Sequence, residues 1–349
     1  MIVAVDARAL AGAPRGVARY TRELVGALAA TFPDDEYRLV VPGRRAVDAL
    51  GAANVATVRP RPPGRVVHGV AAVARRPRLA RLAGRDARVA WLPAPAPVAV
   101  GDIPYVVTVH DLSWEERPAD FTAYERAWHA LARPRALARG AAAVVADAEP
   151  TRAALLERWR LDPARVRVVS PGVPAPAAPR GANRFGRYVL YVGALEPRKA
   201  PELLLGAFAR ARARGLDADL VVAGTGRRAR ALAGRPGVHL LGAVSDAELE
   251  GLYTHALAVV LPSWLEGYGL PPLEALARGT PAIVADLRVY DGTLGGAALR
   301  FAPGDAAALA DALVRVEGER DRLLAAAPPL PAWVDAARAL HAILADAAG

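Results

Sequence analysis

The sequence predicts an α/β protein built from two doubly wound domains, each with a parallel sheet. Short apolar runs alternate with segments of helical period along the chain, which is typical of parallel βαβ units. The length of 349 residues exceeds one compact core and suits two domains of about 150 to 180 residues each. Residues 170–186 are rich in proline and glycine and lack periodicity, which indicates a linker between two such series.

Before the linker, seven short apolar runs have the character of buried strands. They are residues 2–5, 37–41, 55–58, 89–92, 105–109, 143–146 and 166–169. Residues 17–30 have a helical period, and residues 151–160 are predicted to form a second helix with Thr151 as its N-cap after Pro150.

After the linker the same alternation begins again. Strands are expected over residues 188–192, 219–223, 238–241, 258–261 and 282–284, and helices over 201–214, 246–254 and 306–316. Ser245 is placed as the N-cap of the helix 246–254. A last helix, 332–348, carries Trp333, Leu340 and Leu344 on one side.

The composition indicates a globular protein of a reducing, cytoplasmic compartment. Hydrophobic residues make up 53% of the chain and cysteine is absent, which excludes a disordered chain, a disulfide framework and a thiolate metal site. The apolar N-terminal run is interrupted by Asp6 and Arg8, so we interpret it as a buried strand and not as a secretory signal. Residues 89–109 are broken by Asp102 and four prolines, so no membrane span is expected.

The net charge of +10 suits nucleic acid, an anionic membrane surface or phosphorylated substrates. Lys199 is the single lysine among 45 basic residues, and glutamine is absent. This skew resembles nucleotide bias, so residue types that the bias disfavours need a reason to be present. Lys199 is therefore the first candidate for a functional cation, because its compact charge differs from a guanidinium.

Residues 261–281 carry the most chemical information in the chain. A strand ends near Leu261, Gly267 and Gly269 follow in a loop, and two prolines mark a helix start. Free amides at such a start suit a diphosphate, and the carboxylates of Glu266 and Glu274 suit sugar hydroxyls. From these residues alone, a tight turn and a carboxylate that complements the helix dipole remain an equal alternative.

The segment EGYGLPPLEALARGTP, with two glutamates eight positions apart, closely resembles the signature of retaining family-4 glycosyltransferases of the GT-B fold. The resemblance extends over nearly the whole chain. It includes residues 5–24, 108–118, 191–208, 220–226, 238–253, 281–286 and 295–305. The sequence motifs LEPRK and VHDLSW are most similar to those of mannosyltransferases that build surface polysaccharides.

The resemblance implies two Rossmann-like domains with an inter-domain cleft. Residues 1–175 would form an N-terminal acceptor-binding domain and residues 176–330 a C-terminal nucleotide-sugar-binding domain. Residues 331–349 would form a C-terminal helix, with the hypothesis that it crosses back to the first domain.

The resemblance also implies roles for individual residues. Glu266 would contact the donor sugar, Glu274 the ribose, and Lys199 the diphosphate. Relatives often carry arginine at the position of Ala194, and Arg198 is interpreted as its substitute. His110 would face the donor sugar from the N-terminal domain. Further donor-binding residues are Gly16, Gly193, Gly226, Gly267, Tyr268, Gly269 and Leu270.

Other polar residues are given structural interpretations. The remaining histidines, His68, His129, His239, His255 and His341, have no comparable context. Asp217 and Asp219 form a D-x-D that precedes a buried strand, so no metal site is expected there.

The predicted reaction is hexosyl transfer with retention, without a metal and without a permanently bound cofactor. The donor would be a nucleotide-diphosphate sugar, with GDP-mannose favoured, and the acceptor a glycan, a lipid-linked molecule or a small molecule. Basic segments such as Arg75-Arg76 and residues 78–85 support the hypothesis of a peripheral contact with an anionic membrane at the inner membrane face. Nucleic acid is not expected, because the arginines are scattered without interleaved aromatic residues.

Two alternatives remain open. A sugar-nucleotide epimerase on the same fold would need additional acid/base carboxylates, and none can be singled out. A non-catalytic protein that binds nucleotide sugars or nucleic acid is ranked last.

Overall fold

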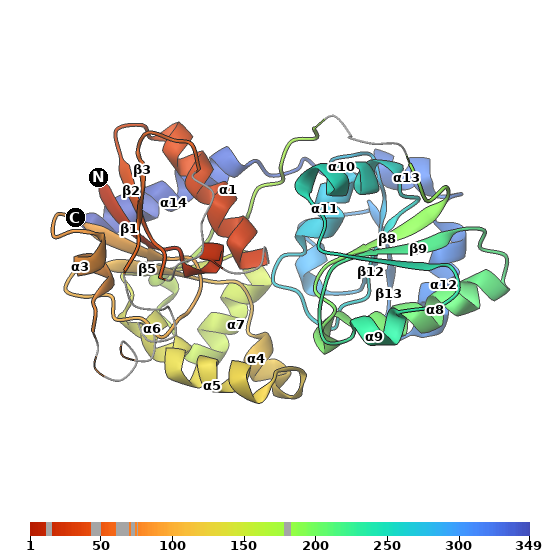
Figure 1. Cartoon of the computed structure of the whole chain (residues 1–349), viewed down its shortest axis with the longest axis horizontal. Helices are drawn as coiled ribbons and strands as arrows, with labels where there is room; N and C mark the ends of the chain where they lie inside the picture. Colours follow the sequence, from red (N-terminus) through yellow and green to blue (C-terminus); the bar gives the residue numbers. More distant parts are fainter. Residues whose placement is uncertain (12–15, 43–49, 61–69, 71–73, 75, 178–182) are drawn as a thin grey trace. The chain divides into compact units, whose positions relative to one another are not determined.

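The computed structural model describes residues 1–11, 16–42, 50–60, 70, 74, 76–177 and 183–349 (Figure 1). They form two compact units, Met1–Gly172 with Pro331–Gly349 and Val173–Leu330. His68 and Arg75 lie outside the described residues.

The first unit is built on a seven-stranded parallel sheet with the order β3-β2-β1-β4-β5-β6-β7. The strands are β1 (Ile2–Asp6), β2 (Glu36–Val40), β3 (Val55–Val58), β4 (Val89–Leu92), β5 (Tyr105–Val109), β6 (Ala143–Ala146) and β7 (Val166–Val168). All seven predicted strands are thereby confirmed to within a residue at either end. They were recognisable because each is a short run in which apolar residues predominate.

Helices cover both faces of this sheet. On one face α1 (Gly16–Thr31) packs against α14 (Trp333–Ala348), and Figure 1 shows the two together. Their contact buries Tyr20, Leu24 and Leu28 of α1 with Trp333, Leu340 and Leu344 of α14. The last helix of the chain therefore completes the core of the first unit. The opposite face is covered by α3 (Leu79–Ala83), α6 (Pro134–Gly140) and α7 (Glu149–Trp159).

The predicted cap of α7 is wrong. The helix begins at Glu149, and its N-cap is Ala148, whose backbone is extended. Pro150 lies in the first turn, where its missing N–H costs no hydrogen bond, so the helix starts before the proline and not after it. Thr151 Oγ1 instead donates a hydrogen bond to the carbonyl of His110 at 3.3 Å. In addition, no element was expected in the region of α4 (Ser113–Glu116), α5 (Ala123–Ala132) and α6.

The second unit contains a six-stranded parallel sheet with the order β10-β9-β8-β11-β12-β13. The strands are β8 (Tyr188–Val192), β9 (Asp219–Ala223), β10 (Val238–Gly242), β11 (Val259–Leu261), β12 (Ala282–Ala285) and β13 (Ala298–Phe301). The first five were predicted. The edge strand β13 was not predicted.

Helices also cover both faces of the second sheet. One face carries α8 (Pro201–Ala213), α9 (Ala229–Leu232), α12 (Ala306–Arg315) and α13 (Arg320–Ala325), and the other carries α10 (Asp246–His255) and α11 (Leu270–Leu276). Ser245 caps α10 as predicted, in a capping box with Glu248. Among the described helices, none combines the length and apolar character that crossing a membrane requires.

Candidate active site

The loops that follow β8, β9 and β11 meet at the carboxyl edge of the second sheet. Their backbones touch directly: Leu195 N donates to Thr225 O at 2.9 Å, and a Cβ on Gly226 would collide with the backbone of Leu195. A Cβ on Gly224 would likewise collide with the carbonyl of Gly193. Gly193 and Gly226, both expected near the donor, therefore lie in loops that pack against each other at the ligand-binding edge of a doubly wound sheet.

Lys199 and Glu266 meet at this edge although 67 residues separate them. Lys199 Nζ donates to Glu266 Oε1 at 2.5 Å, and Ser263 Oγ donates to the same oxygen at 2.6 Å. Only 14% of the Lys199 side chain and 7% of the Glu266 side chain are exposed. Arg198, in the short helix η4 (Pro197–Lys199), holds the same loop pair together, because its carbonyl accepts from Trp264 N at 2.9 Å. The buried pair therefore joins the loop after β8 to the loop after β11.

Ser263 is a site residue that was not singled out from the sequence. It is fully buried and follows β11 by two residues. The position of Ser263 just after a predicted strand could have indicated a site residue, because the loops beyond the carboxyl ends of parallel strands hold ligands.

Gly269 is the N-cap of α11 and adopts a left-handed conformation with φ +80°. A Cβ at this position would lie 2.6 Å from the ring of Tyr290. Tyr290 is fully buried, and among the described residues its hydroxyl makes no hydrogen bond. Burial raises the pKa of this hydroxyl well above its usual range, and the nearby charge of Glu266 raises it further, so the phenol stays neutral. Tyr268, beside Gly269, is also buried.

We expect Gly269→Ala to weaken both stability and donor binding. A left-handed alanine costs about 1 to 2 kcal/mol, and the added methyl group must also displace the Tyr290 ring. Gly279→Ala is the matched control, because Gly279 has φ +68° but a Cβ there would meet no atom within 4 Å. Thermal unfolding and donor titration measure the two effects. Equal losses for both variants would show that the contact with Tyr290 carries no weight.

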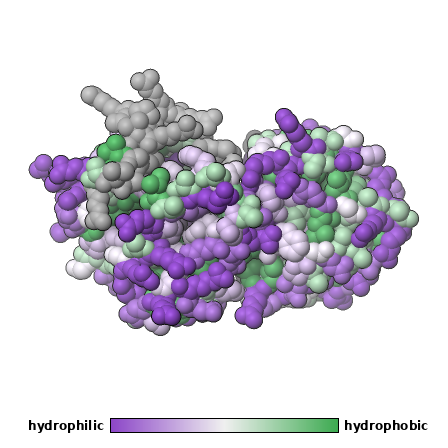
Figure 2. Space-filling model, turned by 90° about the horizontal axis from the view of Figure 1, so that it is seen from below, coloured by the Kyte–Doolittle hydropathy of each residue, from purple (hydrophilic) through white to green (hydrophobic). Residues whose placement is uncertain are grey.

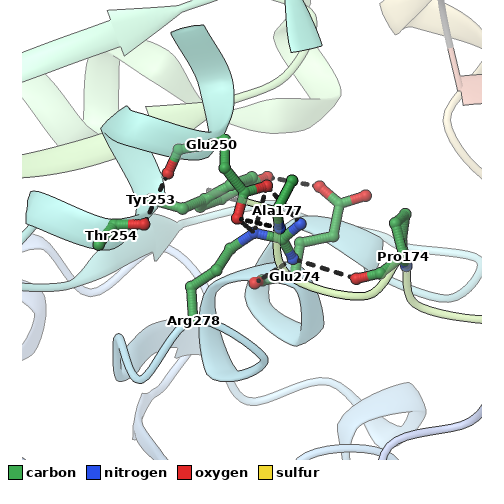
Figure 3. A network of polar contacts seen from close by, with 7 residues as sticks. All are labelled: Pro174, Ala177, Glu250, Tyr253, Thr254, Glu274 and Arg278. Atoms are coloured by element: carbon green, nitrogen blue, oxygen red, sulfur yellow. Dashed lines mark hydrogen bonds and ion pairs between the residues drawn. The ribbon is translucent and has the colours of Figure 1, made fainter. Parts of the chain in front are cut away.

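Glu274 lies in α11 and is part of a buried polar network in the second unit (Figure 3). Its Oε2 accepts a hydrogen bond from the Tyr253 hydroxyl at 2.7 Å, and only 2% of the residue is exposed. Arg278, one turn further on, donates from Nη1 to the Glu274 carbonyl at 2.9 Å. Glu274 is therefore held rigidly, with one carboxylate oxygen engaged by Tyr253.

The same network ties the linker to α10 and α11 (Figure 3). Arg278 pairs with Glu250 at 2.7 Å, and the side chains are 5% and 8% exposed. Glu250 Oε1 also accepts from Ala177 N at 3.0 Å, and Arg278 Nη1 donates to Pro174 O at 3.4 Å. Neither Glu250 nor Arg278 was singled out from the sequence. Arg278 follows Glu274 by one helical turn, which was the available signal.

In the first unit, His110 directly follows β5, as predicted. Its Nδ1 lies 2.6 Å from Asp147 Oδ2, and the ring is contacted edge-on by Tyr20 at 4.7 Å between centroids. Gly16 begins α1, and a Cβ there would meet no atom within 4 Å. Asp147 was not singled out from the sequence.

The described histidines other than His110 lie mostly in structural contacts. His129 stacks on Trp114, and His341 Nε2 contacts Asp35 at 2.7 Å. His239 contacts Asp219 at 2.7 Å, and Arg212 also pairs with Asp219, so this acidic residue of the D-x-D is engaged by two neighbours. Within the described ranges, no three histidine, cysteine or acidic residues gather in a way that could hold a metal ion.

Two units of this kind, each a parallel sheet covered by helices, make up the GT-B fold, and solved structures share this fold. Sucrose-phosphate synthase from Thermosynechococcus elongatus superposes with a TM-score of 0.72 at 20% identity over 99% of this chain and 96% of that one. HepE from Anabaena, solved with UDP and glucose, has a TM-score of 0.68 at 16% identity over 99% of both chains. These likenesses establish the fold.

Sequence comparison then places the chain within that class. Residues 186–318 match the model for glycosyl transferases group 1, and residues 14–177 match the model for Glycosyltransferase Family 4. The chain therefore carries a Glycosyltransferase Family 4 domain followed by a glycosyl transferases group 1 domain. It is similar to a D-inositol 3-phosphate glycosyltransferase of Frankia alni, with 34% identity over 54% of this chain and 54% of that protein.

A shorter match is the O-antigen chain mannosyltransferase RfbU of Salmonella typhimurium, with 42% identity over 23% of each chain. The matched part of the chain spans about half the length of the D-inositol 3-phosphate relative.

Proposed function

We propose that the protein transfers a hexose, with mannose favoured, from a nucleotide-diphosphate sugar to an acceptor with retention at the anomeric carbon. The observation that carries the proposal is the buried cluster of Lys199, Glu266 and Ser263 at the carboxyl edge of the second sheet. Its cation and carboxylate match the two ends of such a donor, the diphosphate and the sugar hydroxyls.

Without donor, Lys199 and Glu266 neutralise each other. A diphosphate carries more negative charge than one carboxylate, so it competes for Lys199 and leaves Glu266 free to accept hydrogen bonds from sugar hydroxyls. Arg198 adds positive charge beside Lys199. Glu274, already oriented by Tyr253, accepts from the ribose hydroxyls, and the amides of Gly267 to Leu270 complete the donor site.

The proposed step needs no covalent intermediate and no metal. The bond between the anomeric carbon and the leaving phosphate oxygen breaks, and the acceptor oxygen attacks from the same face. The acceptor proton passes to the departing phosphate oxygen, so the products are the glycosylated acceptor and a nucleoside diphosphate. Lys199 and Arg198 stabilise the charge that develops on that leaving group.

We propose that the enzyme is cytoplasmic and that its first unit binds the acceptor, which is a glycan, a lipid-linked molecule or a small molecule. We also propose that the enzyme makes a peripheral contact with an anionic membrane. Figure 2 shows a mostly hydrophilic surface from below. Within the described residues, α5 supplies two of the few exposed large hydrophobic side chains, Tyr124 at 63% and Leu131 at 50%. Arginines follow both on the same segment, a pattern that suits an anionic interface. Co-sedimentation with phosphatidylglycerol vesicles tests this part, and equal recovery with neutral vesicles contradicts it.

The reaction is tested by incubating the full chain with GDP-mannose, UDP-glucose and other nucleotide sugars, and measuring release of nucleoside diphosphate with and without chelator. We expect release from GDP-mannose that survives chelation. Formation of an isomeric nucleotide sugar instead would favour the epimerase. Neither release nor isomerisation with any donor would overturn the proposed function.

A further inference from the structure

The pair of Lys199 and Glu266 lies where the strand order of the second sheet reverses. From β8 the chain continues to β9 and β10 on one side, and it then returns to β11 on the other side of β8. Lys199 follows β8 and Glu266 follows β11, so both lie beyond the carboxyl ends of the two strands at this switch point. Ligands of doubly wound sheets bind at such a place, so the topology of the second unit marks this pair as a ligand site.

Tyr290 lies against the same site from the next strand. It ends the short helix η5 (Arg288–Tyr290), which follows β12, the neighbour of β11. A Cβ on Gly269 would lie 2.6 Å from the Tyr290 ring and 2.9 Å from its hydroxyl oxygen, so the hydroxyl end of the ring lies against the segment 266–269. Burial raises the pKa of Tyr290, and the charge of Glu266 raises it further, so the carboxylate is close enough to act on the phenol.

The hydroxyl of Tyr290 is an unused hydrogen-bond donor. The residue is fully buried, and its hydroxyl has no partner among the described residues. Two other buried phenols of the second unit are hydrogen-bonded, because Tyr188 donates to Leu252 O at 2.8 Å and Tyr253 donates to Glu274 Oε2 at 2.7 Å. A buried hydroxyl without a partner costs stability, so its retention in a ligand site calls for an explanation.

The hydrogen bonds of Glu266 converge on one carboxylate oxygen. Lys199 Nζ and Ser263 Oγ both donate to Oε1, at 2.5 and 2.6 Å. An anion that binds Lys199 removes the cation from a carboxylate that is only 7% exposed. A buried carboxylate in that state needs another donor, and the neutral hydroxyl of Tyr290 can supply it.

We propose that Tyr290 is a positioning residue, whose hydroxyl donates a hydrogen bond to Glu266 when a diphosphate draws Lys199 away. In the free protein the ammonium of Lys199 holds the carboxylate, and the phenol has no role. In the bound protein the phenol takes over and keeps Glu266 ionised and oriented. Tyr290 acts through Glu266 and does not touch the ligand, because its side chain is closed to solvent. The identity of the ligand as a diphosphate rests on the proposed function.

A comparison without any ligand tests this exchange, because Lys199→Ala also takes the cation away from Glu266. In the Lys199→Ala protein the hydroxyl should already bond to Glu266, so Tyr290→Phe should lower the melting temperature there by about 2 to 4 °C. In the wild type the same substitution removes a hydroxyl without a partner, so the melting temperature should stay the same or rise. A loss in the wild type, or an equal change in both backgrounds, overturns the inference.

Two buried tyrosines serve as matched controls. Tyr37 in β2 is also fully buried, and its hydroxyl has no partner within the described ranges, but it lies in the core of the first unit. Tyr37→Phe should therefore change the melting temperature equally with and without Lys199. Tyr188→Phe removes a bonded hydroxyl and should lower the melting temperature equally in both backgrounds. A dependence of either control on Lys199 would show that the coupling is not specific to Tyr290 and would overturn the assignment.

Titration of the full chain with GDP and UDP tests the bound state. We expect Tyr290→Phe to weaken the binding of a nucleotide that the wild type binds by about 10-fold, as for one hydrogen bond to a charged group, whereas Tyr37→Phe leaves the affinity unchanged. In the Glu266→Gln background the loss should shrink, because the acceptor is no longer charged. An unchanged affinity, or a full loss that persists in that background, overturns the inference. If neither nucleotide binds the wild type, the proposed function fails, and the comparison of melting temperatures still decides the role of Tyr290.

Discussion

Replacing Lys199 with alanine is expected to lower kcat by about 100- to 1,000-fold, the usual cost of removing one preorganised charge from a developing anion. The ammonium group is the cation of the cluster at the carboxyl edge of the second sheet, 2.5 Å from Glu266 Oε1. Without it, the leaving diphosphate loses its compact positive partner. Release of nucleoside diphosphate under saturating donor measures the effect.

Three further variants show what this loss means. Lys199→Arg retains the positive charge but replaces the ammonium group with the guanidinium that all other basic side chains of the Lys/Arg type carry in this sequence. A large loss of kcat in this variant would show that the site requires a compact ammonium. Arg212→Ala, an exposed cation on α8, controls for loss of charge in general. Thermal unfolding of Lys199→Ala with and without Glu266→Gln shows how much stability the unpaired buried carboxylate costs, apart from any change in kcat. A folded Lys199→Ala protein with wild-type kcat would exclude the proposed role.

Replacing Arg278 with alanine is expected to lower the free energy of unfolding by about 3 to 5 kcal/mol, because it leaves the Glu250 carboxylate buried without its partner. The variant also removes hydrogen bonds to the carbonyls of Glu274 and Pro174. Arg278 joins the linker to α11, which carries Glu274, so we expect the affinity for the donor to fall as well. Denaturant unfolding gives the first quantity, and donor titration gives the second.

Arg187→Ala is the matched control for this prediction. Arg187 and Glu317 also approach to 2.7 Å in the second unit, but about half of each side chain is exposed. Solvent already screens that pair, so its loss should change stability little. Similar losses in the free energy of unfolding for Arg187→Ala and Arg278→Ala would show that breaking the buried Arg278–Glu250 pair costs no more than breaking an exposed pair.

Much of the fold was readable because parallel strands buried on both faces leave a strong local pattern. Strands β4, β5 and β6 of the first sheet are short apolar runs, and the capping box at Ser245 is likewise a local signal. Helices α4 to α6 escaped prediction; they bury few residues, and α5 buries only Ala132. The start of α7 was misplaced because proline fits the first turn as well as the position before it.

Site residues divide in the same way. Lys199, Glu266, Gly269 and Glu274 could be named from the sequence, since a lone lysine and a glycine–proline loop after a strand are local features. Their partners could not be. Ser263, Tyr253, Asp147 and the Arg278–Glu250 pair become visible only where loops and strand ends meet.

The sequence by itself determined the two α/β series and the candidate residues for donor binding, because periodicity and turn composition act over a few neighbouring residues. The tertiary structure decided which of these residues touch. Lys199 finds Glu266 across 67 positions, and the register of β5 with β6 sets His110 beside Asp147 across 37. Contacts of this length depend on sheet order and loop packing, which no local pattern encodes.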